Sequence, residues 1–279
     1  MKKICLRTTK PLDYIDDLLR LYSEIDDINI DYAKNIINET NKLYKGQIDF
    51  GYAKNLQDKW YESLKTNSPD YSVYNDKYYF TDLICCWQMY SKNYLLSLEK
   101  NKLKKNNKSL KEEIGSVNRI FDLGCGLGLT TALLKQIYPS AEVIGTNLKN
   151  TKQYAFCKKL SEIFNFTVLD NNELNGKVDL IFASEYFEHI EDAISNIQTY
   201  LMTFKPKYLY LANSFNTVSV GHFKTYKYKG NAYHNDILYH ETKASRAFNQ
   251  QMKFLEYWPV ATTNWNNKPS LWKKNVMVE

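Results

Sequence analysis

The stretch IFDLGCGLGLTT at residues 120–131 is the feature that most constrains the fold of this chain. An apolar run ends in an acid, three glycines follow at alternate positions, and a helix-like pattern comes next. Glycine permits a sharp turn with positive φ and removes the side chain that would hold a ligand away from the backbone. The helix after such a turn points its N-terminus at the ligand. The stretch therefore predicts a ligand-binding turn between a strand and a helix.

From about residue 117 the sequence alternates between predicted strands and helices, which is the signature of an α/β sheet. Residues 214–240 have poor periodicity, so a long loop or insertion is expected there. The predicted strands contain VNRIFDLG, AEVIGTN, FTVLD, KVDLIFAS and KYLYLANS, with two closing strands near 254–263 and 270–278. Helices are expected over 129–138, 151–164, 190–204 and about 241–251.

The first 110 residues are predicted to form a separate helical region. The polar, charged segment 99–113 is typical of a linker or a solvated helix end, so we expect a domain boundary near residue 110. The chain is thus divided into residues 1–110, acting as a cap or a substrate-recognition region, and a ligand-binding domain over 111–279 that carries the insertion at about 214–240. Apolar residues recur at helical spacing in three N-terminal segments, 11–22, 30–44 and 80–98.

Composition indicates a globular protein: 44% of the 279 residues are hydrophobic, 24% are charged and the mean hydropathy is −0.52. No apolar run reaches about 18 residues, so no membrane span is expected. The first residues lack the features of a signal peptide. Five cysteines without paired spacing favour neither a disulfide framework nor a zinc site, and a cytoplasmic location fits best. The irregular spacing of His234, Asp236 and His240 does not indicate a metal site either.

The acid at Asp122 distinguishes between two ligands that such a turn can bind. The stretch GCGLG differs from the G-x-G-x-x-G spacing of dinucleotide-binding turns. A carboxylate two residues before the first glycine would repel a pyrophosphate. It would suit a cationic sulfonium or an α-amino group, directly or through water. This argues against a dinucleotide and for S-adenosylmethionine.

FDLGCGLG resembles the first motif of class I S-adenosylmethionine-dependent methyltransferases, an acid followed by L-G-C-G-x-G. The later segments VIGTN, FTVLD, VDLIFASEYFEHIED and YLYLANS follow in a similar order, and SEYFEHIED resembles the E-x-x-E-H-x-x-D segment of many members. The resemblance covers roughly residues 117–213. It implies a Rossmann-like methyltransferase sheet with helices on both faces, S-adenosylmethionine as the cofactor and methyl transfer as the activity.

The resemblance also implies roles for residues at the ends of the strands. Asp170 would lie near the adenine amino group, and Ser184 and Glu185 would face the methyl group and the acceptor. The residues expected to line the methionine and ribose part of the cofactor are Asp122, Gly124, Cys125 and Gly126.

One departure from the family pattern lies at the end of the second strand. Members usually carry an acid there that accepts both ribose hydroxyls, whereas this chain has Asn147. An amide accepts one hydroxyl and donates to another without bringing charge. Asn147 is equally consistent with a ribose contact and with a plain turn residue. A catalytically inactive methyltransferase-fold binding subunit is a further hypothesis, which the intact DLGCGLG opposes.

Two classes of methyl acceptor are open. The first is a nucleobase, and DNA is the expected nucleic acid. Residues 205–279 hold 11 Lys and Arg against four Asp and Glu, with lysines interleaved among aromatic residues. Lys227 and Lys229 would neutralise phosphates, while Trp265 and Trp272 would stack on an extruded base. These features favour the nucleobase slightly.

The second class is a small molecule such as a phenol, an amine or a sugar. The stretch EYFEHIEDA is closer to the small-molecule branch of the family, and the N-terminal helices would then cap the pocket. His189 or Glu185 would be the base, although a structural role for His189 is the commoner one. Four residues are the catalytic candidates: Ser184, Glu185, Tyr186 and His189. Four tyrosines either cover the site or pack structurally: Tyr71, Tyr74, Tyr78 and Tyr79.

Overall fold

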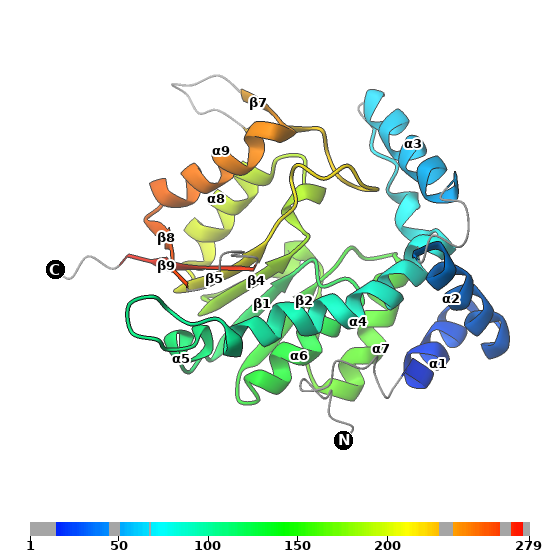
Figure 1. Cartoon of the computed structure of the whole chain (residues 1–279), viewed down its shortest axis with the longest axis horizontal. Helices are drawn as coiled ribbons and strands as arrows, with labels where there is room; N and C mark the ends of the chain where they lie inside the picture. The colour runs from blue at the N-terminus through cyan, green and yellow to red at the C-terminus, as the bar shows by residue number, and fades with distance from the viewer. Residues whose placement is uncertain (1–14, 45–50, 67, 229–236, 263–268, 276–279) are drawn as a thin grey trace.

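A seven-stranded sheet forms the middle layer of the computed structural model, which describes residues 15–44, 51–66, 68–228, 237–262 and 269–275 (Figure 1). The strand order is β3-β2-β1-β4-β5-β9-β8. The first five strands run parallel, and β9 runs antiparallel to both β5 and β8. The strands are β1 Arg119–Leu123, β2 Glu142–Thr146, β3 Thr167–Leu169, β4 Leu180–Ser184, β5 Tyr208–Ala212, β8 Tyr257–Pro259 and β9 Ser270–Lys274. The predicted α/β sheet is confirmed.

Helices cover both faces of this sheet (Figure 1). Helices α4, α6 and α7 lie on one face, and α8 and α9 lie on the other. The described helices are α1 Ile15–Asp26, α2 Ile30–Tyr44, α3 Gly51–Lys65, α4 Lys77–Lys100, α5 Leu110–Ile114, α6 Leu129–Ile137, α7 Lys152–Phe164, α8 Ala193–Phe204 and α9 Glu241–Phe254. Three short 3-10 turns are η1 Tyr71–Asn75, η2 Asn171–Glu173 and η3 Phe187–His189. No described helix is long and apolar enough to cross a membrane.

Side chains of the inner strands alternate between two apolar clusters, one on each face of the sheet. Ile120 and Phe182 pack with the helices α4, α6 and α7. Phe121 and Ile181, their neighbours along the strands, pack with α8 and α9. Because successive side chains of a strand point to opposite faces, buried strands of this kind are apolar along their whole length. This parity also decides where polar residues on the strands can point.

The strand order reverses between β1 and β4, because β1 continues to β2 on one side whereas β4 continues to β5 on the other. Leu123 of β1 lies beside Ala183 of β4, so the two strands end side by side. In open parallel sheets the loops that leave such a reversal point diverge, and ligands bind in the crevice between them. The glycine stretch and SEYFEHIED both begin here.

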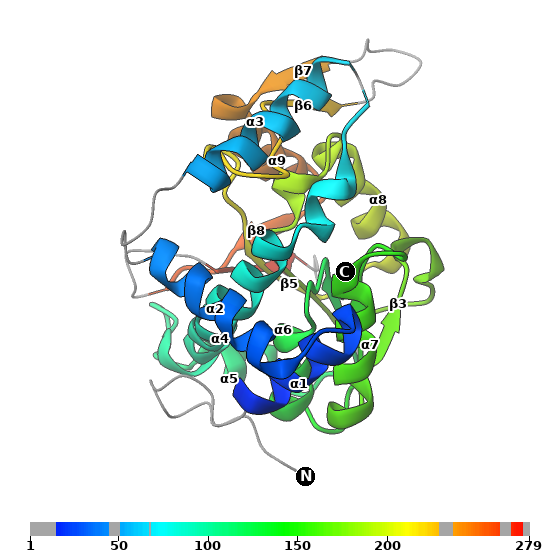
Figure 2. The same cartoon turned by 90° about the vertical axis from the view of Figure 1, so that its right-hand side faces the viewer.

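The N-terminal helices share an apolar cluster with the sheet domain. Leu18 of α1, Ile84 of α4 and Leu134 of α6 belong to the same buried cluster. Helix α1 packs against α2 and α7, and α2 packs against α4; Figure 2 shows α1 beside α7, with α3 toward the other end of the molecule. The expected linker 99–113 contains α5, whose first turn has a capping box formed by Ser109 and Glu112. The boundary near residue 110 stays a prediction.

The insertion that was expected as a long loop contains a two-stranded hairpin, β6 Thr225–Tyr228 and β7 Ile237–His240. The prediction of an irregular segment is therefore wrong for these residues. Tyr226 is fully buried whereas Lys227 is exposed, which is the alternation of a half-buried strand. Four residues are too few for this period to be read from sequence.

Candidate active site

A cavity of about 680 Å³ lies at the carboxyl ends of β1 and β4. Its volume falls within the range of small-molecule and cofactor sites. The glycine loop and the turns after β2, β3 and β4 form one wall. The other wall comes from η1 and the start of α4, through Tyr71, Tyr74 and Tyr79. The N-terminal region thus contributes directly to the cavity, and these tyrosines line it rather than only packing elsewhere. The side chain of Tyr78 lies outside the described residues.

The glycine loop has three glycines with positive φ, at +63° for Gly124, +55° for Gly126 and +83° for Gly128. A Cβ atom on Gly124 would overlap the ring of Tyr186. A Cβ atom on Gly126 would meet nothing within 4 Å, so the backbone there lies bare at the cavity wall. The amide of Cys125 donates to the carbonyl oxygen of Thr146 at 2.8 Å and ties the loop to β2. The loop is thus held open toward a ligand.

Asp122 points away from the cavity. It lies two residues after Ile120 on β1, so both side chains point to the same face of the sheet. The Asp122 carboxylate therefore faces α6 and accepts hydrogen bonds from Thr130 Oγ1 and Thr131 Oγ1, both at 2.6 Å. Burial raises the pKa of Asp122 to about 7, against the lowering effect of the two threonines. The side chain is 1% exposed and does not line the cavity. The expected direct contact with a cofactor is therefore corrected: Asp122 braces the start of α6.

Asn147 braces the loop and also lines the cavity. Its Nδ2 donates to the carbonyl oxygen of Gly126 at 2.6 Å, and its Oδ1 accepts from the amide of Leu148 at 2.9 Å. An amide side chain has two N–H groups and two lone pairs. One N–H and one lone pair of Asn147 are therefore left over after the turn is formed. This geometry fits both a turn residue and a residue that contacts the ribose.

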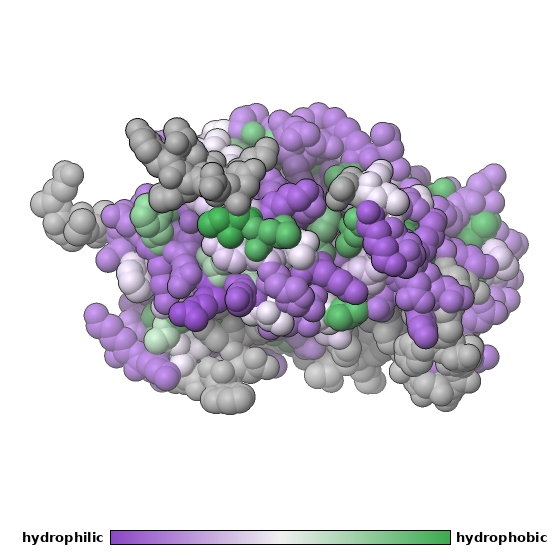
Figure 3. Space-filling model, turned by 90° about the horizontal axis from the view of Figure 1, so that it is seen from above, coloured by the Kyte–Doolittle hydropathy of each residue, from purple (hydrophilic) through white to green (hydrophobic). Residues whose placement is uncertain are grey.

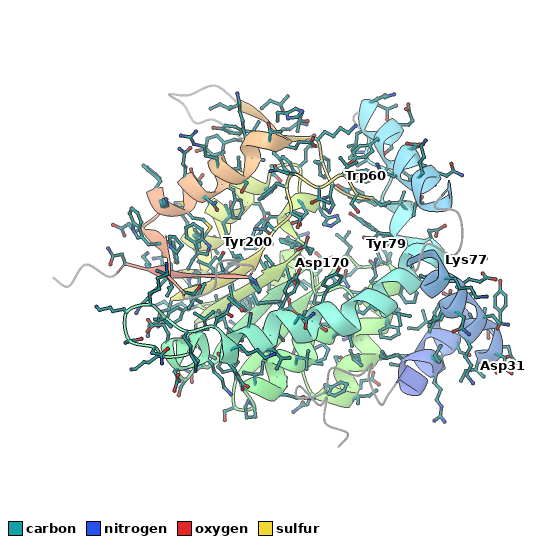
Figure 4. All side chains as sticks on the ribbon, viewed as in Figure 1. Asp31, Trp60, Lys77, Tyr79, Asp170 and Tyr200 are labelled. Atoms are coloured by element: carbon teal, nitrogen blue, oxygen red, sulfur yellow. The ribbon has the colours of Figure 1, made fainter. Side chains whose placement is uncertain are left out.

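Asp170 ends β3 but caps the following turn instead of lining the cavity. Its carboxylate accepts from the amide of Asn172 at 3.1 Å. The next residue, Asn171, lines the cavity and donates from Nδ2 to the hydroxyl of Tyr186 at 3.1 Å. Its Oδ1 is buried and has no hydrogen-bond partner among the described residues. Asn171, rather than Asp170, is thus the residue after β3 that lines the cavity; Asp170 is labelled in Figure 4.

The turn after β4 brings Ser184, Glu185 and Tyr186 to the cavity wall. Glu185 has a φ of +49°, and its amide donates to the carbonyl oxygen of Ala212 at 2.7 Å. Its carboxylate accepts from the hydroxyl of Tyr94 on α4 at 3.0 Å. Burial raises the pKa of Tyr186 well above its ordinary value, so this phenol keeps its proton and serves as a wall. Glu185 carries the carboxylate that reaches the cavity from this turn.

His189 lines the cavity beside two other rings. Its Nδ1 lies 3.0 Å from the hydroxyl of Tyr74, and its ring centroid lies 4.6 Å from that of His222. Burial, with His222 adding to it, lowers the pKa of His189 to about 3, so the imidazole is neutral at neutral pH. Gly221, at a φ of +83°, passes so close that a Cβ atom would overlap both Tyr74 and His189. The contact between Gly221 and His189 could not be predicted from sequence, because Gly221 lies 32 positions beyond His189.

Glu188 lies behind Glu185 and is fully buried. Its Oε1 accepts from the amide of Ser214 at 2.7 Å, whereas its Oε2 has no hydrogen-bond partner among the described residues. Burial and the negative charge of Glu185 raise the pKa of Glu188 well above its ordinary value.

Of the four residues expected to contact nucleic acid, Lys227 and Trp272 lie in the described part of the chain. Lys227 forms an ion pair with Glu191 at 2.8 Å. Trp272 is 5% exposed, since β9 lies inside the sheet and this side chain packs under α8 and α9. Its expected stacking on a base is therefore corrected to a core role. Lys229 and Trp265 lie outside the described residues. The described part of the chain also contains no group of three His, Cys, Asp or Glu arranged to hold a metal ion.

Comparison with solved structures finds similar folds among methyltransferases. A protein from Nostoc punctiforme, provisionally named an O-methyltransferase, shares 12% identity over 79% of this chain and 68% of its own, with a TM-score of 0.49. A provisionally named RNA methyltransferase from Pyrococcus horikoshii shares 12% identity over 69% of this chain and 85% of its own, with a TM-score of 0.43. Magnesium protoporphyrin IX methyltransferase from Synechocystis, solved with bound S-adenosylmethionine, shares 16% identity over 60% and 74% of the two chains, with a TM-score of 0.39.

The family assignment comes from the sequence. No curated protein sequence matches significantly. A family model described as a methyltransferase domain matches residues 94–257, which is more than half of the chain. The match begins within α4 and includes the glycine loop, the turn after β4 and the β6–β7 hairpin. The chain therefore belongs to the methyltransferase-domain family, as a class I S-adenosylmethionine-dependent methyltransferase with a Rossmann-like fold.

Proposed function

We propose that this enzyme methylates a small molecule held between the turn after β4 and the tyrosines of the N-terminal region. The observation that carries the proposal is the second wall of the cavity, formed by Tyr71, Tyr74 and Tyr79. Trp60 of α3, labelled with Tyr79 in Figure 4, supports this wall. Its ring packs against Tyr71 and Tyr74, and its Nε1 donates to the carbonyl oxygen of His222 at 2.8 Å. Apolar and aromatic walls with few polar groups are typical of small-ligand sites.

The cofactor end of the cavity fits S-adenosylmethionine, which supplies an activated methyl group on a cationic sulfur. The bare backbone at Gly126 allows the close approach that a cofactor needs. The leftover N–H and lone pair of Asn147 suit ribose hydroxyls. Asn171 lines the cavity on the side of β3 and brings an amide side chain to the expected adenine end. Ser184 would lie nearer the reacting methyl group, and Gly124 and Cys125 complete the loop.

Two charged residues line the described part of the cavity: Glu185, and Lys149, which forms an ion pair with Glu173. Tyr74 and His189 are hydrogen-bonded to each other, and burial raises the pKa of Tyr74 while it lowers that of His189. Both groups are therefore neutral and suited to orienting a polar acceptor. Methyl transfer requires the acceptor atom, the methyl carbon and the sulfur in line, so such orientation is the main contribution expected of the protein.

A nucleobase in DNA is supported only by the basic composition of residues 205–279. Lys227 is neutralised by Glu191, and Trp272 is buried. The hairpin strand β7 also presents Ile237 and Leu238 to solvent at 42% and 61% exposure. Strand β7 lies at the top of the molecule in Figure 1. Figure 3, which views the molecule from that side, shows an apolar patch on this face. Phosphate binding favours a basic surface instead.

The test is calorimetric titration with S-adenosylhomocysteine, alone and with a mixed-sequence DNA duplex at low salt. We expect saturable binding that the duplex does not change. A panel of phenols, amines and sugars is then screened for release of S-adenosylhomocysteine from S-adenosylmethionine. Tightening of cofactor binding by the duplex, lost as salt is added, would contradict a small-molecule acceptor and favour the nucleobase.

A further inference from the structure

Two carboxyl groups meet at the floor of the acceptor end. Glu185 lines the cavity, and Glu188 lies directly behind it with no exposed surface. The Glu188 Oε2 atom has no hydrogen-bond partner among the described residues, although the Glu185 side chain is within hydrogen-bonding reach of Glu188. Carboxylates only accept hydrogen bonds, so two ionised groups cannot satisfy each other. A proton between them satisfies both.

Among the described residues, the surroundings of this pair supply hydrogen bonds and no positive charge. Tyr94 donates to Glu185, and Ser214 donates its amide to Glu188. Three further titratable groups face the pair: Tyr74 of η1, Tyr226 of β6 and His222. Burial raises the pKa of both tyrosines and lowers that of His222, so all are neutral near pH 7. Burial and the neighbouring Glu185 raise the pKa of Glu188 well above its ordinary value, so Glu188 keeps its proton near pH 7.

We propose that the Glu185–Glu188 pair is the proton acceptor of the methyl transfer and that its proton occupancy follows the charge of the bound cofactor. The inference rests on the proposed function and deepens it. Without a cation beside it, the pair holds one proton on Glu188, shared with Glu185. A sulfonium beside Glu185 supplies the missing positive charge and favours release of that proton. The Glu185 carboxylate then faces the acceptor without the proton that Glu188 had shared with it.

The reaction step balances with this arrangement. The acceptor loses a proton from its oxygen or nitrogen to Glu185 as its lone pair forms the new bond to the methyl carbon. The old carbon–sulfur bond breaks, and its electron pair stays on sulfur. The cofactor product is neutral, so the pair again keeps one proton, and the proton just taken fills that place. The acceptor class is therefore one whose reacting atom carries a proton, a hydroxyl or an amine.

His189 is the other base candidate, and its environment argues against that role. Its Nδ1 is occupied by Tyr74, and burial lowers its pKa to about 3. A general base works best when its pKa lies near the operating pH. His189 is thus a positioning residue for the acceptor, whereas the carboxyl pair takes the proton.

The experiment counts protons and needs no acceptor. Binding of S-adenosylmethionine and of S-adenosylhomocysteine is measured by calorimetry near pH 7 in buffers of different ionisation enthalpy. The two ligands differ by the methyl group and the charge on sulfur, so titration of their shared amino acid part cancels. We expect S-adenosylmethionine to release up to about one proton more than S-adenosylhomocysteine.

Two variants locate that proton. Glu188→Gln and Glu185→Gln should each abolish the difference while S-adenosylhomocysteine still binds, which also reports that the protein is folded. Glu191→Gln is the matched control, because Glu191 lies three residues after Glu188, does not line the cavity and pairs with Lys227; the difference should persist. Infrared spectroscopy gives a second readout: Glu188→Gln should remove one carboxylic acid C=O component at pH 7 that Glu191→Gln keeps, while the component from Asp122, whose pKa is raised to about 7, stays in both variants.

Equal proton release with both ligands would overturn the inference, as would a difference that survives Glu188→Gln. Identical carboxylic acid bands in the unaltered protein and in Glu188→Gln at pH 7 would also overturn it. Binding of both ligands without a difference leaves the cofactor assignment intact and removes only the carboxyl pair from the chemistry. Binding of neither ligand would remove the cofactor site, and the present inference with it.

Discussion

The two walls of the cavity are built in different ways. The cofactor wall consists of turns that directly follow parallel strands, so neighbouring strands fix its residues in space. The acceptor wall joins Tyr74 of η1 and Tyr79 of α4 to His189 and Gly221. Both of these residues lie more than 100 positions further along the sequence than the two tyrosines. The cofactor wall therefore depends on local backbone geometry, whereas the acceptor wall depends on distant packing. Changes to one wall should leave the other largely unaffected, and the predictions below test this separation.

The largest effect is expected at Asp122, under the cofactor wall. Its pKa is raised by burial from 3.8 to about 7, so the folded protein binds a proton that the unfolded chain has released. The free energy of unfolding should therefore fall between about pH 4 and pH 7, by as much as about 4 kcal/mol at 1.36 kcal/mol per pKa unit. Urea denaturation at several pH values measures it. Asp122→Asn should flatten this slope, and an unchanged slope would mean that another group causes it.

Gly124→Ala is expected to have the next largest effect, on the cofactor wall alone. The new Cβ atom overlaps the Tyr186 ring, and the backbone at position 124 has a left-handed φ. Overpacking and positive φ together cost about 2–4 kcal/mol. Calorimetry should show at least a tenfold loss of S-adenosylhomocysteine affinity. Gly115→Ala is the control, with a similar φ of +68° but nothing within 4 Å, so equal losses in both would attribute the effect to backbone strain.

Gly221→Ala should disturb the acceptor wall and spare the cofactor wall. Its Cβ atom overlaps the Tyr74 hydroxyl and the His189 ring, which are side chains that can partly move. We expect a loss of about 2 kcal/mol in unfolding free energy, with S-adenosylhomocysteine affinity unchanged within about twofold. A loss of affinity as large as that of Gly124→Ala would show that the two walls are not separate.

The smallest effect is expected for Lys227→Ala, outside both walls. Its ion pair with Glu191 joins side chains that are 54% and 40% exposed. Surface pairs of this kind contribute about 0–1 kcal/mol. Thermal unfolding and cofactor affinity should both stay nearly unchanged. A large drop in DNA affinity at low salt would instead return this residue to an acceptor surface.

The cofactor wall could be predicted from sequence better than the acceptor wall, because it depends on local backbone geometry rather than on distant packing. The glycine loop, the strand ends and Asn147 are neighbours along the chain or end adjacent parallel strands, so their meeting follows from the βαβ pattern. The errors at this wall arise from side-chain direction. Asp122 points to α6 through strand parity, and Asp170 caps a turn while Asn171 lines the cavity.

The acceptor wall could be predicted only in part. The tyrosine-rich segment was recognised as a possible cover, but its partners were not, since nothing local brings Gly221 and His222 to His189. The helix α3, which carries Trp60, was missed because its apolar residues form a weak stripe. Trp272 was taken for a surface residue because a tryptophan among lysines suggests stacking, whereas β9 buries it inside the sheet.

The cluster that joins Leu18, Ile84 and Leu134 has a consequence for engineering. A chain shortened to begin after α4 would expose the surface of α6 that α4 now covers. The segment that we propose shapes acceptor choice thus also packs against the body of the methyltransferase domain and helps to keep it folded. New specificity would be introduced more readily by changing single aromatic residues in place than by exchanging the whole leading segment as a cassette.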